Sequence, residues 1–120
     1  MSEMKDATGV MERSSGVSGE RRLSVVVDRC GEYDTKQLRF TITGFDFGHP
    51  QYAYNILHVV RQEPGVKTAE LFSQAGEVYV TLQPWQLVSD DLMVKLAKVI
   101  GADALGFPGK HIDVTVPLHP

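Results

Sequence analysis

The strongest constraint on this chain is a pattern of extended and helical segments that occurs twice after residue 38. Each half contains a strand, a helix and a second strand, and the two halves are similar in length. Apolar residues at every second position indicate the strands, as at Leu38, Phe40 and Ile42, and apolar residues three and four positions apart indicate the helices. Few topologies place two such units in one sheet, because crossover connections between parallel strands are right-handed.

The predicted elements are separated by glycine, proline and small polar residues. In chain order they are a strand at 38–43, a helix at 53–63, strands at 66–72 and 78–82, and a helix at 90–100. Ser89 is the expected N-cap of the second helix, and Gly101 is its expected C-terminal glycine. Two segments, at 104–107 and 112–116, compete for the last strand, and the sequence does not decide between them.

This order predicts an α+β fold, the ferredoxin-like βαββαβ sandwich, with both helices on one face of the sheet. Alternating apolar residues at 23–27 predict an additional N-terminal strand, placed at the edge of the sheet. The face away from the helices is expected to carry Arg39, Thr41, Thr43, Tyr79 and Thr81. This mixed face, neither fully polar nor apolar, favours a homodimer in which a second sheet covers it.

Length and charge limit the other possibilities. The 120 residues fit one compact domain, which we place at 22–120 after a flexible Ser- and Gly-rich tail at 1–21. The formal net charge of -3 argues against a nucleic-acid partner. No apolar run is long enough to insert in a membrane, and the start lacks a secretory signal, so we predict a cytoplasmic protein.

Several segments of the repeated region resemble a heavy-metal-associated domain, the small fold of copper chaperones. The resemblance covers roughly residues 38 to 107 and lies in spacing and a few shared residues. The segments that carry it are FTITGF at 40–45, VVRQEPGV at 59–66, AEL at 69–71, GEVYVT at 76–81 and the second helix from 91 to 102. The resemblance implies a ferredoxin-like fold.

The metal motif of that family is missing from this chain. Its members hold Cu(I) with two thiolates of a Cys-x-x-Cys motif in the loop after the first strand. Here Phe47 and Pro50 stand at those two positions, and neither side chain binds a metal. We therefore expect no cofactor and no copper transfer. The chain is predicted to be a non-catalytic protein-interaction module, an accessory or regulatory subunit of a larger system.

A metal site with other ligands is a second interpretation. Asp46 and His49 lie in the same loop, and a carboxylate with an imidazole can hold zinc or nickel. Two ligands are too few for one ion, so this site would have to be completed across a dimer. The simpler interpretation is that the two side chains form local hydrogen bonds.

Aromatic residues around the same loop are compatible with a binding surface for a protein or a small apolar ligand. The candidate interaction residues are Phe45, Asp46, Phe47, His49 and Tyr52, together with Trp85 from the later connection. The alternative is that Phe45 and Phe47 pack under the helices and complete the core. The expected partner is another protein or a second copy of the chain, and a homo-oligomer is favoured.

Catalytic motifs are weak in this sequence. Asp90 and Asp91 form an acidic pair, but their place at a helix start accounts for them through the helix dipole. Cys30, the only cysteine, lies in no local cluster of cations that would activate it. No glycine-rich phosphate loop is present. A small dimeric α+β-barrel enzyme or ligand-binder, with a pocket between sheet and helices, is the third interpretation.

Overall fold

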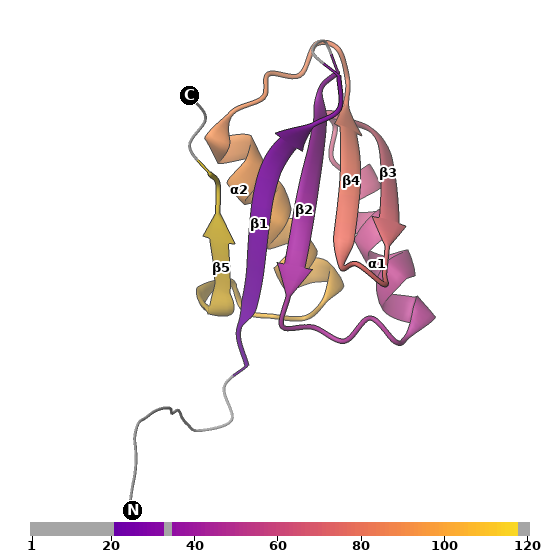
Figure 1. Ribbon diagram of the computed structural model, residues 1–120, viewed down its shortest axis with the longest axis vertical. Helices are drawn as coiled ribbons and strands as arrows, with labels where there is room; N and C mark the ends of the chain where they lie inside the picture. Colours follow the sequence, from indigo (N-terminus) through magenta and orange to yellow (C-terminus); the bar gives the residue numbers. More distant parts are fainter. Residues whose placement is uncertain (1–20, 33–34, 118–120) are drawn as a thin grey trace, which may run out of the picture.

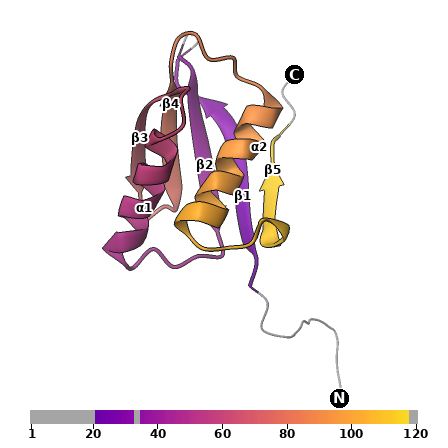
Figure 2. The same ribbon diagram turned by 180° about the vertical axis from the view of Figure 1, so that it is seen from behind.

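The computed structural model describes residues 21–32 and 35–117, so all but the last residue of the predicted tail at 1–21 lies outside the described residues. The described chain forms a five-stranded mixed sheet with two helices, a small α+β domain as predicted. The strands are β1 Leu23–Cys30, β2 Gln37–Thr43, β3 Val66–Phe72, β4 Glu77–Leu82 and β5 Ile112–Thr115. The helices are α1 Pro50–Arg61 and α2 Asp90–Val99. Figure 2 shows both helices in front of the sheet, and Figure 1 shows its uncovered face.

The strand order is β3-β4-β2-β1-β5, in which β1 and β5 are parallel and the other neighbours are antiparallel. The prediction that the N-terminal strand lies at the edge is therefore wrong, because β1 lies between β2 and β5. The physical reason is burial: Leu23, Val25 and Val27 are all fully buried. In an interior strand these apolar side chains are completely shielded from water, whereas an edge strand would leave part of their surface exposed.

The segment at 112–116 supplies the last strand, as β5. The competing segment at 104–107 is not a strand, because the chain continues from α2 into a π-helical turn, Ile100–Ala104. Helix α2 ends at Val99 with Ile100 as its C-cap, so Gly101 directly follows the cap as predicted, but it lies inside the π-helical turn and its backbone is not left-handed. Gly101 is instead a site of close packing: a Cβ there would lie 2.6 Å from Cδ1 of Ile112 and 3.0 Å from Cδ2 of Leu23.

The start of α2 confirms its predicted N-cap. The backbone N–H of Leu92 donates to Ser89 Oγ at 3.2 Å, and Asp90 and Asp91 occupy the first turn. Helix α1 begins earlier than predicted, at Pro50, because the fixed backbone angle of proline suits the first helical position.

Apolar side chains fill the space between the sheet and the helices. Phe40, from the middle of β2, is the largest fully buried side chain, and the buried residues in the described ranges are all apolar. None of the helices in these ranges has the length and apolarity that a membrane crossing requires.

No helix of the described part of the chain lies on the other face of the sheet (Figure 1). Here lie the side chains that alternate with the buried ones, which include Arg39, Thr41, Thr43, Tyr79 and Thr81. This part of the prediction is confirmed. In the register of the sheet, Arg39 lies between Asp28 of β1 and Tyr79 of β4. We call this surface the open face.

Hydrogen exchange tests the interior position of β1. This strand pairs with β2 on one side and with β5 on the other over residues 24–26. Consecutive amides at Ser24, Val25 and Val26 should exchange slowly, because each points to a partner strand. Along the edge strand β3, protected and unprotected amides should alternate. Residue-resolved NMR exchange checks this, and alternation over residues 24–26 as well would contradict the strand order.

The substitution Gly101→Ala tests the packing at the end of α2. It should destabilise the domain by about 1–3 kcal/mol through overpacking, although alanine is the better helix former. Gly109→Ala is the matched control, because no neighbouring atom lies within 4 Å of its added Cβ. The control should change stability by less than about 0.5 kcal/mol in urea unfolding. Equal stabilities of the two variants would contradict the close approach described at Gly101.

Candidate functional site

The loop between β2 and α1, with the first turn of α1, carries most of the predicted interaction residues. The ring of Phe45 lies at its centre, 5.0 Å from that of Phe47, 4.7 Å from Tyr52 and 6.1 Å from Phe107. All three contacts are edge-to-face, a favourable arrangement of aromatic rings. The rings of Phe45, Phe47 and Tyr52 are partly buried and pack against the core. The structure therefore favours the interpretation in which these aromatic residues complete the core.

Asp46 and His49 lie close to this aromatic group. The carboxylate of Asp46 accepts a hydrogen bond from the backbone N–H of Gly48 at 2.9 Å, which fixes the loop locally. The exposed His49 precedes α1, and its ring lies 6.3 Å from that of Tyr52. Within residues 21–32 and 35–117, no three His, Cys, Asp or Glu side chains are grouped so that they could hold a metal ion.

Phe47 and Pro50 both contribute to the fold. Phe47 contacts Phe45, and Pro50 is the first residue of α1. Cysteine at these two positions would therefore remove one aromatic contact and one favourable helix start.

Trp85 lies at the opposite end of the sheet, in the loop between β4 and α2 (Figure 1). Its side chain is 65% exposed, and that of Leu87 in the same loop is 77% exposed. The six predicted interaction residues therefore do not form one surface, because the sheet separates Trp85 from the others.

Two cations near the β1–β2 connection hold the loop of Trp85 by its backbone. Lys36 Nζ donates to the carbonyl oxygens of Pro84 at 2.6 Å and of Gln86 at 2.9 Å. Arg29 Nη2 donates to the carbonyl oxygen of Val88 at 3.2 Å. The two cations thus bind the carbonyl groups of alternate residues in this loop. The large side chains of Trp85 and Leu87, which lie between those residues, are exposed to solvent.

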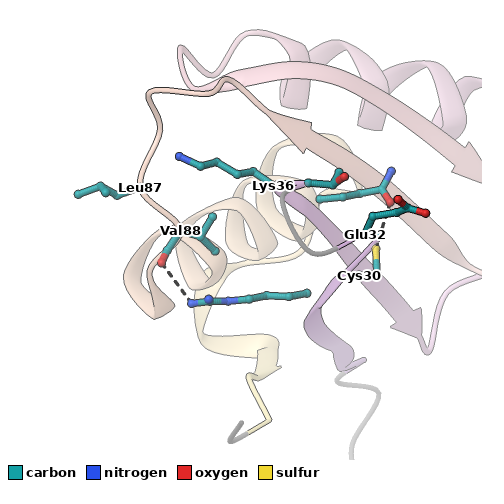
Figure 3. A pocket seen from close by; sticks show the side chains of 9 residues that line it. Cys30, Glu32, Lys36, Leu87 and Val88 are labelled. Carbon is teal, nitrogen blue, oxygen red and sulfur yellow. Dashed lines mark hydrogen bonds between the residues drawn. The ribbon is translucent and has the colours of Figure 1, made fainter. Parts of the chain in front are cut away.

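A hollow beside this loop is lined by Cys30, Glu32, Lys36 and Val88, with Leu87 at its rim (Figure 3). The thiol of Cys30 lies 3.5 Å from the side-chain oxygen of Gln37 and donates to it. Burial raises the pKa of Cys30, and the nearby positive charge of Arg39 opposes this only in part. A protonated thiol is a poor nucleophile, so the geometry gives no activated cysteine here.

Sequence reasoning missed a group of four side chains on the open face, at the β3–β4 hairpin. Glu70 faces Tyr79 across the two strands, and Phe72 faces Glu77 in the same way. The four side chains therefore form a small square, with the two carboxylates on one diagonal and the two aromatic rings on the other. The rings of Phe72 and Tyr79 lie 5.3 Å apart, edge-to-face, and the Tyr79 hydroxyl donates to Glu77 Oε1 at 3.0 Å. We call these four residues the acidic–aromatic corner.

The acidic–aromatic corner lines a groove. The turn residues Ser73, Gln74 and Ala75 and the side chain of Gln37 complete its wall. Phe72 is 52% exposed, so much of its ring is open to a ligand. The signal for this group in the sequence was the turn at 73–76, because a hairpin turn fixes which residues of its two strands face each other.

Charges on the open face are unevenly paired. Two of its carboxylates have guanidinium partners. Oδ1 of Asp28 lies 3.1 Å from Nη2 of Arg39, and Oδ1 of Asp113 lies 3.0 Å from Nη2 of Arg22. The hydrogen bond from Arg22 also lowers the pKa of Asp113. Among the described residues, no cation forms a salt bridge with either carboxylate of the acidic–aromatic corner. The corner therefore holds two carboxylates without an ion pair among the described residues, next to the guanidinium of Arg39, which lies beside Tyr79.

Comparisons with protein-family models, with curated proteins and with solved structures found no match to this chain. The function therefore has to be inferred from its own residues and geometry.

The substitution Lys36→Met should loosen the loop that carries Trp85, because it removes the ammonium group and keeps most of the apolar side chain. Hydrogen bonds to charged groups contribute ~1.5–3 kcal/mol, and partial exposure reduces the expected loss here to about 1–2 kcal/mol. Urea unfolding measures this loss. The fluorescence anisotropy of Trp85, the only tryptophan, should also fall. Lys67→Met, on the exposed part of β3, is the control, and equal effects of both substitutions would contradict the role of Lys36.

Proposed function

We propose that this chain is a non-catalytic protein-interaction module that acts as an accessory or regulatory subunit of a larger system. The observation that supports this most directly is the open face of the sheet (Figure 1). Both helices lie on one side, so no helix among residues 21–32 and 35–117 covers the other side of the five strands. It carries threonine, valine and aromatic side chains among charged ones, a mixture that suits a protein partner.

The fold type in this proposal is ferredoxin-like with one inserted strand. From β2 onward the element order is β2-α1-β3-β4-α2-β5, and both helices share a face. In a four-stranded βαββαβ sheet the last strand pairs with the first, and here β1 lies between those two. The domain would then resemble a heavy-metal-associated domain that has lost its thiolates at the positions of Phe47 and Pro50.

The filled core weighs against an enzyme or ligand-binder of the α+β-barrel type that uses a pocket between sheet and helices. Such a pocket needs a few polar groups that converge on the ligand. In the described ranges the buried residues are apolar, and Phe40 occupies the middle of this space. The metal-binding interpretation retains only Asp46 and His49 as ligands and depends on a second copy of the chain.

The homo-oligomer is the form of this proposal that can be tested with the chain alone. Val26 lies on the open face, with Thr41 and Thr115 as cross-strand neighbours. In sedimentation equilibrium, the full chain should show a mass above that of the monomer. Val26→Arg should return the monomer mass, because it places an unpaired charge in the interface. Lys98→Glu, on the exposed side of α2, is the control and should leave the mass unchanged.

Two results would contradict the proposal. An assembly that Val26→Arg leaves intact would place the contact away from the open face. One-site, sub-micromolar binding of Cu(I), Zn(II) or Ni(II) to the purified chain would make it a metal-handling protein. If His49→Ala then abolished that binding, the metal would be assigned to the loop of Asp46 and His49. A monomeric parent chain would exclude the second copy as the partner.

A further inference from the structure

We propose that the acidic–aromatic corner binds an arginine side chain from a basic segment of a partner protein. The inference rests on the proposed function, because it assigns a partner chemistry to one part of the open face. Three observations carry it: the arrangement of the four side chains, the groove that they line, and two carboxylates that form no salt bridge with a cation of the described residues.

The arrangement of the four side chains suits a planar cation. Cross-strand neighbours have Cβ atoms about 4.5–5.5 Å apart, so one guanidinium group can reach both pairs of the square. The edge-to-face contact of Phe72 and Tyr79 leaves ring surface open, and ring faces attract cations through their quadrupole. The Tyr79 hydroxyl holds one carboxylate in place through its hydrogen bond to Glu77. The site is therefore partly pre-organised before a ligand arrives.

The charge of the corner selects the class of partner. Two carboxylates without a paired cation attract a positive group and repel phosphate, so nucleic acid and anionic lipid are disfavoured. Arginine fits better than lysine, because its planar guanidinium stacks on a ring while its N–H groups fork to carboxylates. A lysine ammonium is a compact and strongly hydrated charge that loses more solvation in such a groove.

The basic segment should lie across the open face rather than extend the sheet as a sixth strand. Addition of a strand requires free backbone groups along an edge. On the edge strand β3, the carbonyl oxygen of Ala69 already accepts a hydrogen bond from Arg61 Nη2 of helix α1 at 2.9 Å. The side chains of Glu70 and Phe72 remain accessible from the face.

Calorimetric titration of the full chain with capped hexa-arginine tests the inference. The experiment uses chain concentrations below any self-association. Glu70→Gln/Glu77→Gln should weaken binding by about tenfold or more, because it removes both carboxylates from the groove. The matched control Glu32→Gln/Asp103→Asn removes the same charge away from the corner, and should change binding by less than about twofold at moderate salt. Thermal melts confirm that each variant is folded.

Three further arms define the ligand. Capped hexa-lysine should bind more weakly than hexa-arginine, and Phe72→Ala should reduce that difference, because it removes the ring on which a guanidinium stacks. Free L-arginine should bind much more weakly than the peptide, because it carries a carboxylate and a single guanidinium.

Several outcomes would overturn the inference: undetectable binding of hexa-arginine, an equal loss in the control variant, equal binding of both peptides, or free arginine as tight as the peptide. An equal loss of affinity in the control variant would show that binding depends on the net charge of the chain and not on the acidic–aromatic corner. If these titrations fail while Val26→Arg still dissolves the assembly, only the arginine site is wrong and the proposed interaction module stands.

Discussion

The alternation of apolar and polar side chains along the strands is the constraint on which the rest of this structure depends. In β2 and β4, every second residue is buried under the helices, and the residues between them lie on the other side of the sheet. Both helices lie on one face because the apolar side chains are on one face. The same pattern leaves a second face with its own chemistry. The proposed function depends on this difference between the buried face and the open face of the sheet.

The two ends of the sheet differ in how they are fixed. At one end, aromatic rings around Phe45 pack against each other and against the core. At the other end, Lys36 and Arg29 hold a loop by its carbonyl oxygens and leave Trp85 exposed. The aromatic residues of the loop that holds Asp46 and His49 therefore contribute to the stability of the domain. This is consistent with a protein that acts through a surface and not through its first loop.

Local sequence patterns predicted the elements well, because each depends on nearby residues. The period of two gave the strands, and Ser89 with its two following aspartates gave the start of α2. The position of β1 was not predictable in this way, since it depends on which side chains the distant helix α2 and strand β5 cover. The close packing of Gly101 was not predictable for a similar reason: its neighbours Leu23 and Ile112 belong to β1 and β5, which are distant in the sequence. The acidic–aromatic corner required the register of β3 against β4, which spacing along one strand does not reveal.

We propose that the open face is the surface through which this chain contacts other protein molecules. Chemical-shift mapping of the isotope-labelled full chain, between dilute and concentrated solution, locates the contact most directly. The account predicts amide shift changes at open-face positions such as Val26, Thr41 and Tyr79, with the amides of α1 and α2 unchanged. Shift changes confined to the helices or to the loop around Asp46 and His49, with the sheet unaffected, would contradict it.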